Sequence, residues 1–241
     1  MTSGINELKV KIFADGADLN DISEMYGNPL IKGLTTNPTL MRKAGVTSYE
    51  KFAHDVLRIV KHKPISFEVF SDDLDEMEKQ ARHISDWAEN VYVKIPITNS
   101  KGLSTSGLVR KLVEKKVKIN VTAIMTIEQV KLVCQSLNPE VPNYISIFAG
   151  RIADTGRDPI QIMKEAIQVL NPIKSSELIW ASPRELLNIM QASQIGCHII
   201  TATTDILRKL DLVGYDLNEY SLDTVKMFYK DALASNFKID S

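Results

Sequence analysis

Short apolar runs rich in β-branched residues alternate with longer segments of helical period along the whole chain. The runs cover residues 11–15, 31–37, 64–70, 91–97, 117–124, 144–150, 177–182 and 197–203. Between them apolar residues recur every three or four positions, as Leu74, Met77, Ala81 and Ile84 do within 71–88. Strands that alternate with helices predict a parallel sheet.

About eight such units favour a closed (β/α)8 TIM barrel in the α/β class, as one domain over 1–241 with no Pro/Gly/Ser-rich linker. An open doubly wound sheet is the alternative, and the absence of a GxGxxG fingerprint weakens its dinucleotide-binding version. An extra C-terminal helix is expected at 221–237, which either covers the barrel or reaches a neighbouring subunit.

Helix starts carry their own signals. Capping boxes are predicted at three places: Thr47 with Glu50, Thr126 with Gln129, and Ser182 with Glu185 around Pro183.

Composition narrows the class of protein. The 241 residues hold 29 Lys+Arg against 30 Asp+Glu, so no basic surface for nucleic acid or a membrane is expected. The two cysteines lie outside any CxxC pattern, and no segment is apolar enough for a secretory signal or a membrane span. The four histidines lack metal-ligand spacing. We expect a cytoplasmic protein with neither metal nor cofactor.

One lysine interrupts the strand-like run VYVKIPIT. Lys94 lies late in its strand, where the catalytic loops of a barrel gather, whereas Lys11, Lys32 and Lys118 lie at the beginnings of theirs. Burial disfavours the ammonium form, and the neutral amine can then form a Schiff base with a ketone.

Other strands also end in polar residues. Any single one could be a cap or a hydrogen-bonded core group, but together with Lys94 they indicate an active site. The set comprises Asp15, Thr35, Asn37, Glu68, Asn120, Thr122, Ser146 and Ser182.

Two segments suggest a phosphate site. Ser182-Pro183-Arg184-Glu185 is expected to open a helix, whose free N–H groups favour an anion, and Arg151 follows another strand end. Ser182 as a simple N-cap is the alternative reading. Together the two segments predict a phosphorylated substrate.

Six motifs resemble those of the transaldolases, in the same order. They are ADGAD (14–18), GLTTNPTL (33–40), VKIPIT (93–98), INVTAIMT (119–126), SIFAGRIADTG (146–156) and ASPRE (181–185). The chain is similar to the short subfamily, which includes fructose-6-phosphate aldolases, over nearly its whole length.

The resemblance implies catalytic roles. Lys94 would form the Schiff base with the ketose, and Asp15 would take the proton of the C4 hydroxyl as the neighbouring carbon–carbon bond breaks. Glu68 and Thr122 would activate the water used in dehydration and hydrolysis.

It also implies substrate contacts. Asn37, Asn120 and Ser146 would bind the dihydroxyacetone unit, beside Thr35 on the same strand as Asn37. The phosphate would be held by Arg151, Ser182 and Arg184.

Two positions bear on the branch of the family. Glu68 and Phe148 resemble the transferase, where the aldolases typically have glutamine and tyrosine. An aldolase that releases dihydroxyacetone, a transaldolase of specialised sugar biosynthesis and a non-catalytic sugar-phosphate-binding barrel stay open. The resemblance further implies a homo-oligomer, such as a pentamer or decamer, and a place in the pentose phosphate pathway.

Overall fold

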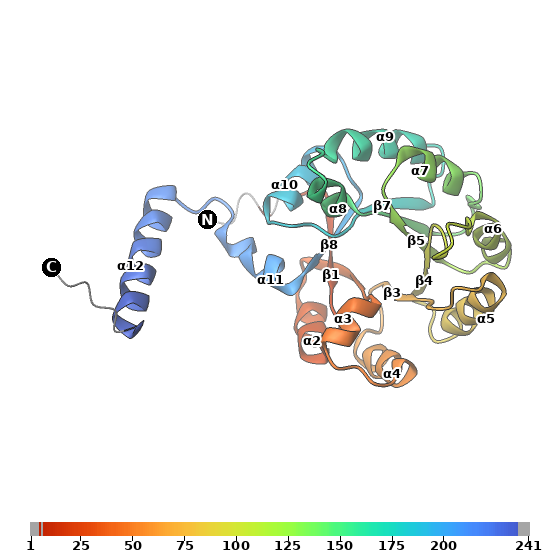
Figure 1. The fold of residues 1–241 in the computed structure, drawn as a ribbon, viewed down its shortest axis with the longest axis horizontal. Helices are drawn as coiled ribbons and strands as arrows, with labels where there is room; N and C mark the ends of the chain where they lie inside the picture. The colour runs from red at the N-terminus through yellow and green to blue at the C-terminus, as the bar shows by residue number, and fades with distance from the viewer. Residues whose placement is uncertain (1–4, 6, 236–241) are drawn as a thin grey trace.

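Eight parallel strands close into a barrel in the computed structural model, which describes residues 5 and 7–235 (Figure 1). The strands follow one another around the barrel in chain order, which confirms the predicted TIM barrel. Their bounds are β1 (Lys11–Asp15), β2 (Ile31–Thr35), β3 (Ile65–Glu68), β4 (Val91–Pro96), β5 (Ile119–Ile124), β6 (Asn143–Ile147), β7 (Ser176–Trp180) and β8 (Ile199–Thr203).

Helices follow each strand, and all but the last surround the barrel (Figure 1). They are α2 (Leu19–Gly27), α3 (Pro38–Lys43), α4 (Tyr49–Ile59), α5 (Leu74–Ser85), α6 (Ser106–Glu114), α7 (Ile127–Cys134), α8 (Ala149–Asp154), α9 (Ile160–Leu170), α10 (Leu187–Gln194), α11 (Thr204–Leu207), the 3₁₀ helix η1 (Arg208–Leu212) and α12 (Leu217–Ser235). No helix within the described part of the chain is long and apolar enough to cross a membrane.

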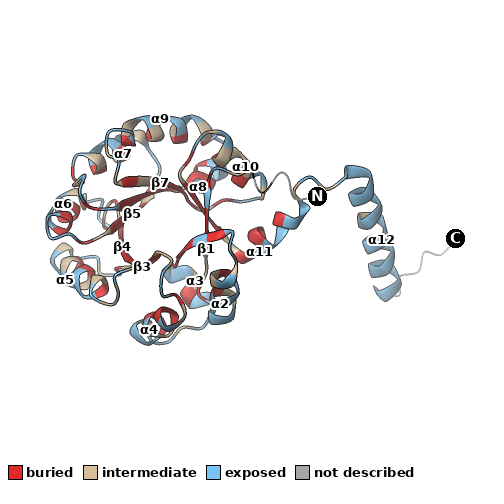
Figure 2. Cartoon of the chain, turned by 180° about the vertical axis from the view of Figure 1, so that it is seen from behind, coloured by how far each residue is buried: buried red, intermediate tan, exposed pale blue. Residues whose placement is uncertain are grey.

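The helices bury the stripe that their period predicts. In α5 Met77, Ala81 and Ile84 are buried, three or four residues apart, and the rest of the helix is half-buried or exposed. Figure 2 shows the same division between buried and exposed positions on the helices around the barrel. Strand residues are buried on both sides because helices cover the outside of the barrel and side chains fill its lumen. This two-sided burial explains the continuous apolar runs in the sequence.

Aromatic rings close the lumen below the strand ends. Phe13, Tyr92 and Tyr144 pack together, with the two tyrosine rings stacked at 4.1 Å between centroids. Each ring lies two residues before a predicted site residue, so strand alternation places it one layer deeper on the same side. An added Cβ at Gly33 would lie 2.4 Å from the Phe13 ring, so any other residue there would have to displace the ring. These rings form the floor of any cavity at the barrel mouth.

Two of the three predicted capping boxes are wrong. Thr126 and Gln129 do form a reciprocal capping box at α7. Helix α4 instead begins after Ser48, whose side chain makes no capping bond, so Thr47 lies one residue too early. The segment around Ser182 does not begin a helix, and α10 starts only at Leu187.

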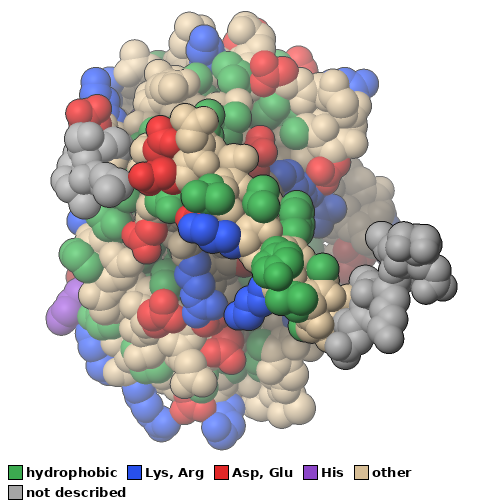
Figure 3. Space-filling view, turned by 90° about the vertical axis from the view of Figure 1, so that its left-hand side faces the viewer, with side chains coloured by type: hydrophobic (Ala, Val, Ile, Leu, Met, Phe, Trp, Pro, Cys, Tyr) green, Lys and Arg blue, Asp and Glu red, His purple; other side chains and the backbone are tan. Residues whose placement is uncertain are grey.

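The last helix stands away from the barrel (Figures 1 and 2). The predicted helix 221–237 corresponds to α12, and residues 236 and 237 lie outside the described part. None of its described residues is buried, so the reading that it covers its own barrel is wrong. Its apolar side chains are exposed, with Phe228 at 62% and Tyr229 at 67%, and hydrophobic groups gather on this side of the molecule (Figure 3).

Candidate active site

A cavity of about 650 Å³ opens at the carboxyl ends of the strands. Every site residue predicted from the sequence lines it except Asn120, which lies beneath and is hydrogen-bonded to one that does. The cavity therefore lies where barrel enzymes place their chemistry.

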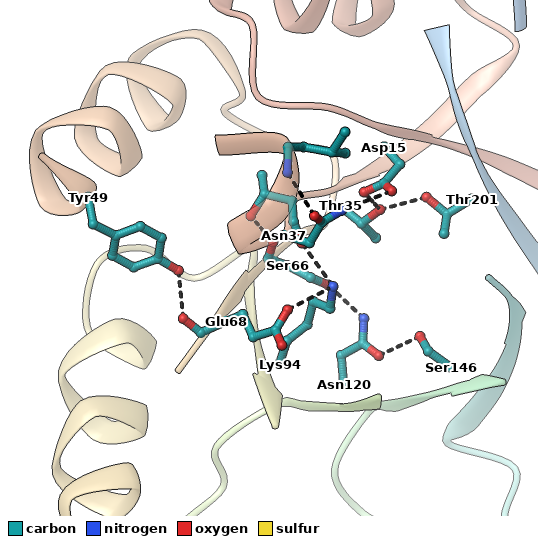
Figure 4. Close-up of polar contacts among 12 residues, drawn as sticks. Asp15, Thr35, Asn37, Tyr49, Ser66, Glu68, Lys94, Asn120, Ser146 and Thr201 are labelled. Atoms are coloured by element: carbon teal, nitrogen blue, oxygen red, sulfur yellow. Dashed lines mark hydrogen bonds and ion pairs between the residues drawn. The ribbon is translucent and has the colours of Figure 1, made fainter. Parts of the chain in front are cut away.

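Lys94 projects into the lumen from the middle of this group (Figure 4). Only 6% of the residue is exposed. Its Nζ donates to the backbone oxygen of Thr36 at 2.9 Å and pairs with Glu68 Oε2 at 3.2 Å. Lys94 is paired in register with Glu68 on β3 and with Asn120 on β5. The pairing of the three strands therefore holds these side chains in one row across the barrel.

Asp15 ends β1 and accepts two hydrogen bonds from the next strand and its loop. Thr35 Oγ1 donates to Oδ1 at 2.8 Å, and Asn37 Nδ2 donates to Oδ2 at 3.2 Å. The pKa of Asp15 lies above its ordinary value because burial outweighs the opposing effects of Lys94, Thr35 and Asn37, while Glu68 raises it further. Asn37 also caps α3 through its Oδ1, which ties the amide to the start of the helix.

A buried polar chain orients the amide beside Lys94. Ser146 Oγ donates to Asn120 Oδ1 at 2.7 Å, and Asn120 Nδ2 donates to Ser66 Oγ at 3.0 Å. Thr122 Oγ1 is buried, lines the cavity and has no hydrogen-bond partner within the described residues. Its hydroxyl is thus free for a water or a substrate group.

Two arginines form the cationic side of the mouth. The Arg151 guanidinium lies over the Phe148 ring, 5.6 Å from its centroid. Arg184 donates from Nε to Asp154 Oδ1 at 2.9 Å and from Nη1 to Ser182 Oγ at 3.1 Å, and its Nη2 pairs with Asp154 Oδ2. Two arginines with preset planes suit an anionic oxyacid group.

The predicted helix N-terminus at Ser182 is replaced by a different device. Ser182 has a φ of +58°, a left-handed conformation that costs free energy for a residue with a side chain. Gly150 of α8 packs against it so closely that an added Cβ would lie 1.6 Å from the Ser182 carbonyl oxygen. The start of α8, which carries Arg151, is therefore held against the loop that carries Arg184. No helix begins at Ser182, so the expected helix dipole is absent there.

Several residues that line the cavity or contact a lining residue were not predicted from the sequence. Thr201 on β8 lies 2.6 Å from Thr35 through their hydroxyl oxygens, and Tyr49 donates to the backbone oxygen of Glu68 at 2.8 Å. The alternation of Thr201 with Thr203 near a strand end was an available signal. Lys43 and Asp205 also line the mouth, but they belong to helices whose facing the sequence pattern leaves open.

A metal centre lacks support in the described residues, where no group of three His, Cys, Asp or Glu side chains is arranged to hold an ion.

The sequence is similar to those of known proteins over most of its length. The family model for transaldolase/fructose-6-phosphate aldolase matches residues 12–239. A "Probable transaldolase" of Thermoanaerobacter sp. is 32% identical over 224 residues, covering 92% of this chain and 98% of that protein. Others from Methanococcus maripaludis and Thermoplasma volcanium are each 34% identical over 83% of this chain, covering 89% and 87% of their own lengths. The chain belongs to the transaldolase/fructose-6-phosphate aldolase family.

Among solved structures, a mutant flavocytochrome b2 with benzoylformate matches with a TM-score of 0.54 at 14% identity. The match covers 81% of this chain and 56% of that one. At this identity the likeness concerns the barrel fold alone.

Proposed function

We propose that the protein is a transaldolase, which moves a dihydroxyacetone unit from a ketose phosphate such as fructose 6-phosphate or sedoheptulose 7-phosphate to an aldose phosphate. The observation that carries this proposal is the burial of Lys94 at a cavity that also holds Asp15 and the arginine pair. An amine, a carboxylate base and an anion clamp are the groups that a Schiff-base transfer of a sugar phosphate requires.

In the first half-reaction the neutral amine of Lys94 attacks the ketose carbonyl, and loss of water gives an iminium. Asp15 takes the proton of the C4 hydroxyl as the C3–C4 bond breaks, and the bond electrons pass into the iminium to form an enamine. The aldose phosphate product then leaves. Glu68 and Thr122 position the water that departs in the dehydration step.

In the second half-reaction an acceptor aldose phosphate binds through the same arginines. The enamine carbon attacks its carbonyl, and Asp15 returns the proton to the new hydroxyl. Water then hydrolyses the iminium and frees Lys94. Thr35, Asn37, Asn120 and Ser146 orient the dihydroxyacetone unit, and Arg151, Ser182 and Arg184 hold the phosphate.

The nearest alternative is an aldolase that releases free dihydroxyacetone, because the family contains both activities. Phe148 favours transfer, since it lacks a hydroxyl that could protonate the enamine. A transaldolase of specialised sugar biosynthesis differs only in its acceptor.

Product analysis separates these activities. With fructose 6-phosphate and erythrose 4-phosphate, a transaldolase forms glyceraldehyde 3-phosphate only when the acceptor is present. Glyceraldehyde 3-phosphate formed with equal free dihydroxyacetone and no acceptor would identify an aldolase. Replacing the acceptor by ribose 5-phosphate tests the range of aldoses, and absence of both reactions would refute the proposal.

We also propose a cytoplasmic homo-oligomer that acts in the pentose phosphate pathway, as the family resemblance implies. The exposed apolar residues of α12 support a subunit contact, because eight large apolar side chains would otherwise stay in water: Leu217, Tyr220, Leu222, Val225, Met227, Phe228, Tyr229 and Leu233.

A further inference from the structure

Thr201 is a buried cavity residue without an assigned role. Only 5% of it is exposed, and its Oγ1 lies 2.6 Å from Thr35 Oγ1. Thr35 Oγ1 in turn lies 2.8 Å from Asp15 Oδ1 (Figure 4). The three side chains form one hydrogen-bonded series, Thr201–Thr35–Asp15. Because β1 lies between β8 and β2, this series passes across the lumen side of β1 and links three strands.

The number of available protons determines which group donates in each of these hydrogen bonds. A general base must be ionised before it acts, and an ionised carboxylate can only accept hydrogen bonds. Thr35 therefore donates its single hydroxyl proton to Asp15 in a hydrogen bond. In the bond between the two threonines, Thr201 must then be the donor and Thr35 the acceptor.

This direction has an electrostatic consequence. A donor bonded to Thr35 Oγ1 polarises its O–H group and strengthens the bond to Asp15, as in other buried hydrogen-bond chains. It also removes the alternative in which the Thr35 hydroxyl turns from Asp15 toward another acceptor. Because Thr201 is neutral, this contact adds no charge to the lumen.

We propose that Thr201 is a positioning residue for the general base, acting through Thr35 to hold the ionised carboxylate of Asp15 ready for proton transfer. The inference rests on the proposed function, since it takes Asp15 as the base of carbon–carbon bond cleavage.

The charges around Asp15 are consistent with a need for such support. Burial raises the pKa of Asp15, and the Thr35 hydrogen bond opposes that rise together with Lys94 and Asn37. Glu68 faces the carboxylate with the same sign and raises its pKa further. Charged groups farther out line the cavity mouth: Lys43, Arg151, Arg184 and Asp205. Weakening the hydrogen bond from Thr35 to Asp15 should therefore raise the pKa of Asp15 further.

Thr201→Val keeps the shape of the side chain but removes its donor, whereas Thr201→Ser keeps the donor. The pH dependence of kcat/KM for transfer from fructose 6-phosphate to erythrose 4-phosphate is measured for both. The acid limb of Thr201→Val should move up by about half a pH unit or more, roughly a threefold loss at a fixed acidic pH. Thr201→Ser should restore the limb of the unmodified protein.

The same substitution on a Thr35→Val background tests the route. Thr201 acting through Thr35 predicts no further movement of the acid limb in the double variant. An unchanged limb in Thr201→Val, an equal loss at every pH, or the same shift on both backgrounds would overturn the proposal.

Thermal unfolding supplies a readout that does not depend on activity. At pH 8, Asp15→Asn should raise the Tm more on the Thr201→Val background than on the unmodified one, by roughly 2 °C or more. A protein without transfer or release activity would refute the proposed function, and this coupling would still test Thr201. Equal Tm changes on both backgrounds would refute the support of Asp15 by Thr201.

Discussion

Glu68 Oε2 lies 3.2 Å from Lys94 Nζ, at paired positions of neighbouring strands, so a carboxylate faces the one lysine at the base of the cavity. The pair is nearly closed to solvent, with side chains exposed by 17% and 8%. A carboxylate in this place can hold the attacking amine and the water that Schiff-base chemistry expels. A glutamine could contact the same groups but could not accept a proton from that water.

The first prediction concerns the branch of the family. Exchanging Glu68→Gln and Phe148→Tyr together should lower transfer and raise the release of dihydroxyacetone relative to it, by roughly tenfold or more if the two groups govern proton delivery. Enzymatic detection of free dihydroxyacetone with and without erythrose 4-phosphate gives the ratio. Phe148→Leu controls for loss of the ring, and an unchanged ratio in the double variant would remove the reason for choosing the transferase.

The second prediction uses the raised pKa of Asp15. Because the folded-state pKa exceeds the unfolded value, Asp15 contributes stability that is complete below the unfolded pKa of about 3.8 and is lost as pH rises through the folded value. Asp15→Asn should be inactive yet more stable at pH 8, by roughly 2–4 °C in Tm for each kcal/mol. The gain should shrink as the pH approaches 4. A gain that grows on acidification would contradict the burial of the carboxylate.

The third prediction concerns the anion clamp. Arg184→Ala removes a charge-assisted contact worth about 1.5–3 kcal/mol, so kcat/KM for fructose 6-phosphate should fall roughly 10–100-fold. Activity with unphosphorylated fructose should change little. Arg208→Ala is the matched control, since this exposed arginine also pairs with carboxylates, Asp21 and Glu24. Equal losses with both sugars would show that Arg184 does not read the phosphate.

The fourth prediction tests the close contact between α8, which carries Arg151, and the loop that carries Arg184. In Gly150→Ala the new methyl group would overlap the Ser182 carbonyl, so α8 and the loop at Ser182 must separate. We expect a loss of about 2 kcal/mol or more in unfolding free energy and a KM increase confined to phosphorylated sugars. Gly16→Ala is the control, because a Cβ there meets nothing within 4 Å. A KM increase with fructose as well would place the damage beyond the phosphate site.

The fifth prediction concerns α12. Replacing Phe228 and Tyr229 by serine removes two apolar side chains that face water in the single chain, so the barrel should stay folded while the subunit contact is lost. Light scattering should then report a smaller assembly than for the unmodified protein, with unchanged circular dichroism. An unchanged mass, or a monomer before substitution, would contradict the oligomer proposal.

The fold could be predicted from the sequence because several independent patterns agreed. Eight apolar runs, amphipathic segments such as 71–88 and polar strand ends all indicated one architecture, and strand alternation then placed Lys94 and Asp15 at the same mouth. Polar strand ends converge in a barrel whatever their exact bounds, so an error of one or two residues did no harm.

Loop conformation and partners across the lumen could not be predicted in this way. The pattern at Ser182-Pro183 predicts a helix start, but Ser182 has a left-handed backbone that packs against Gly150, a residue distant in sequence. The position of Thr201 near a strand end could have indicated a cavity residue, but its partner Thr35 is known only once barrel closure brings β8 beside β1. The apolar residues of α12 fit packing on the barrel as well as exposure, so their pattern could not predict that the helix stands away from the barrel.

Covalent trapping at Lys94 tests the central claim most directly. The protein is incubated with fructose 6-phosphate, reduced with sodium borohydride, digested and analysed by mass spectrometry. A stable dihydroxyacetone adduct should appear on the peptide containing Lys94, and Lys94→Met should abolish it while Lys43→Met, at the mouth of the same cavity, should retain it. An adduct on Lys43 alone, or full activity in Lys94→Met, would contradict the account.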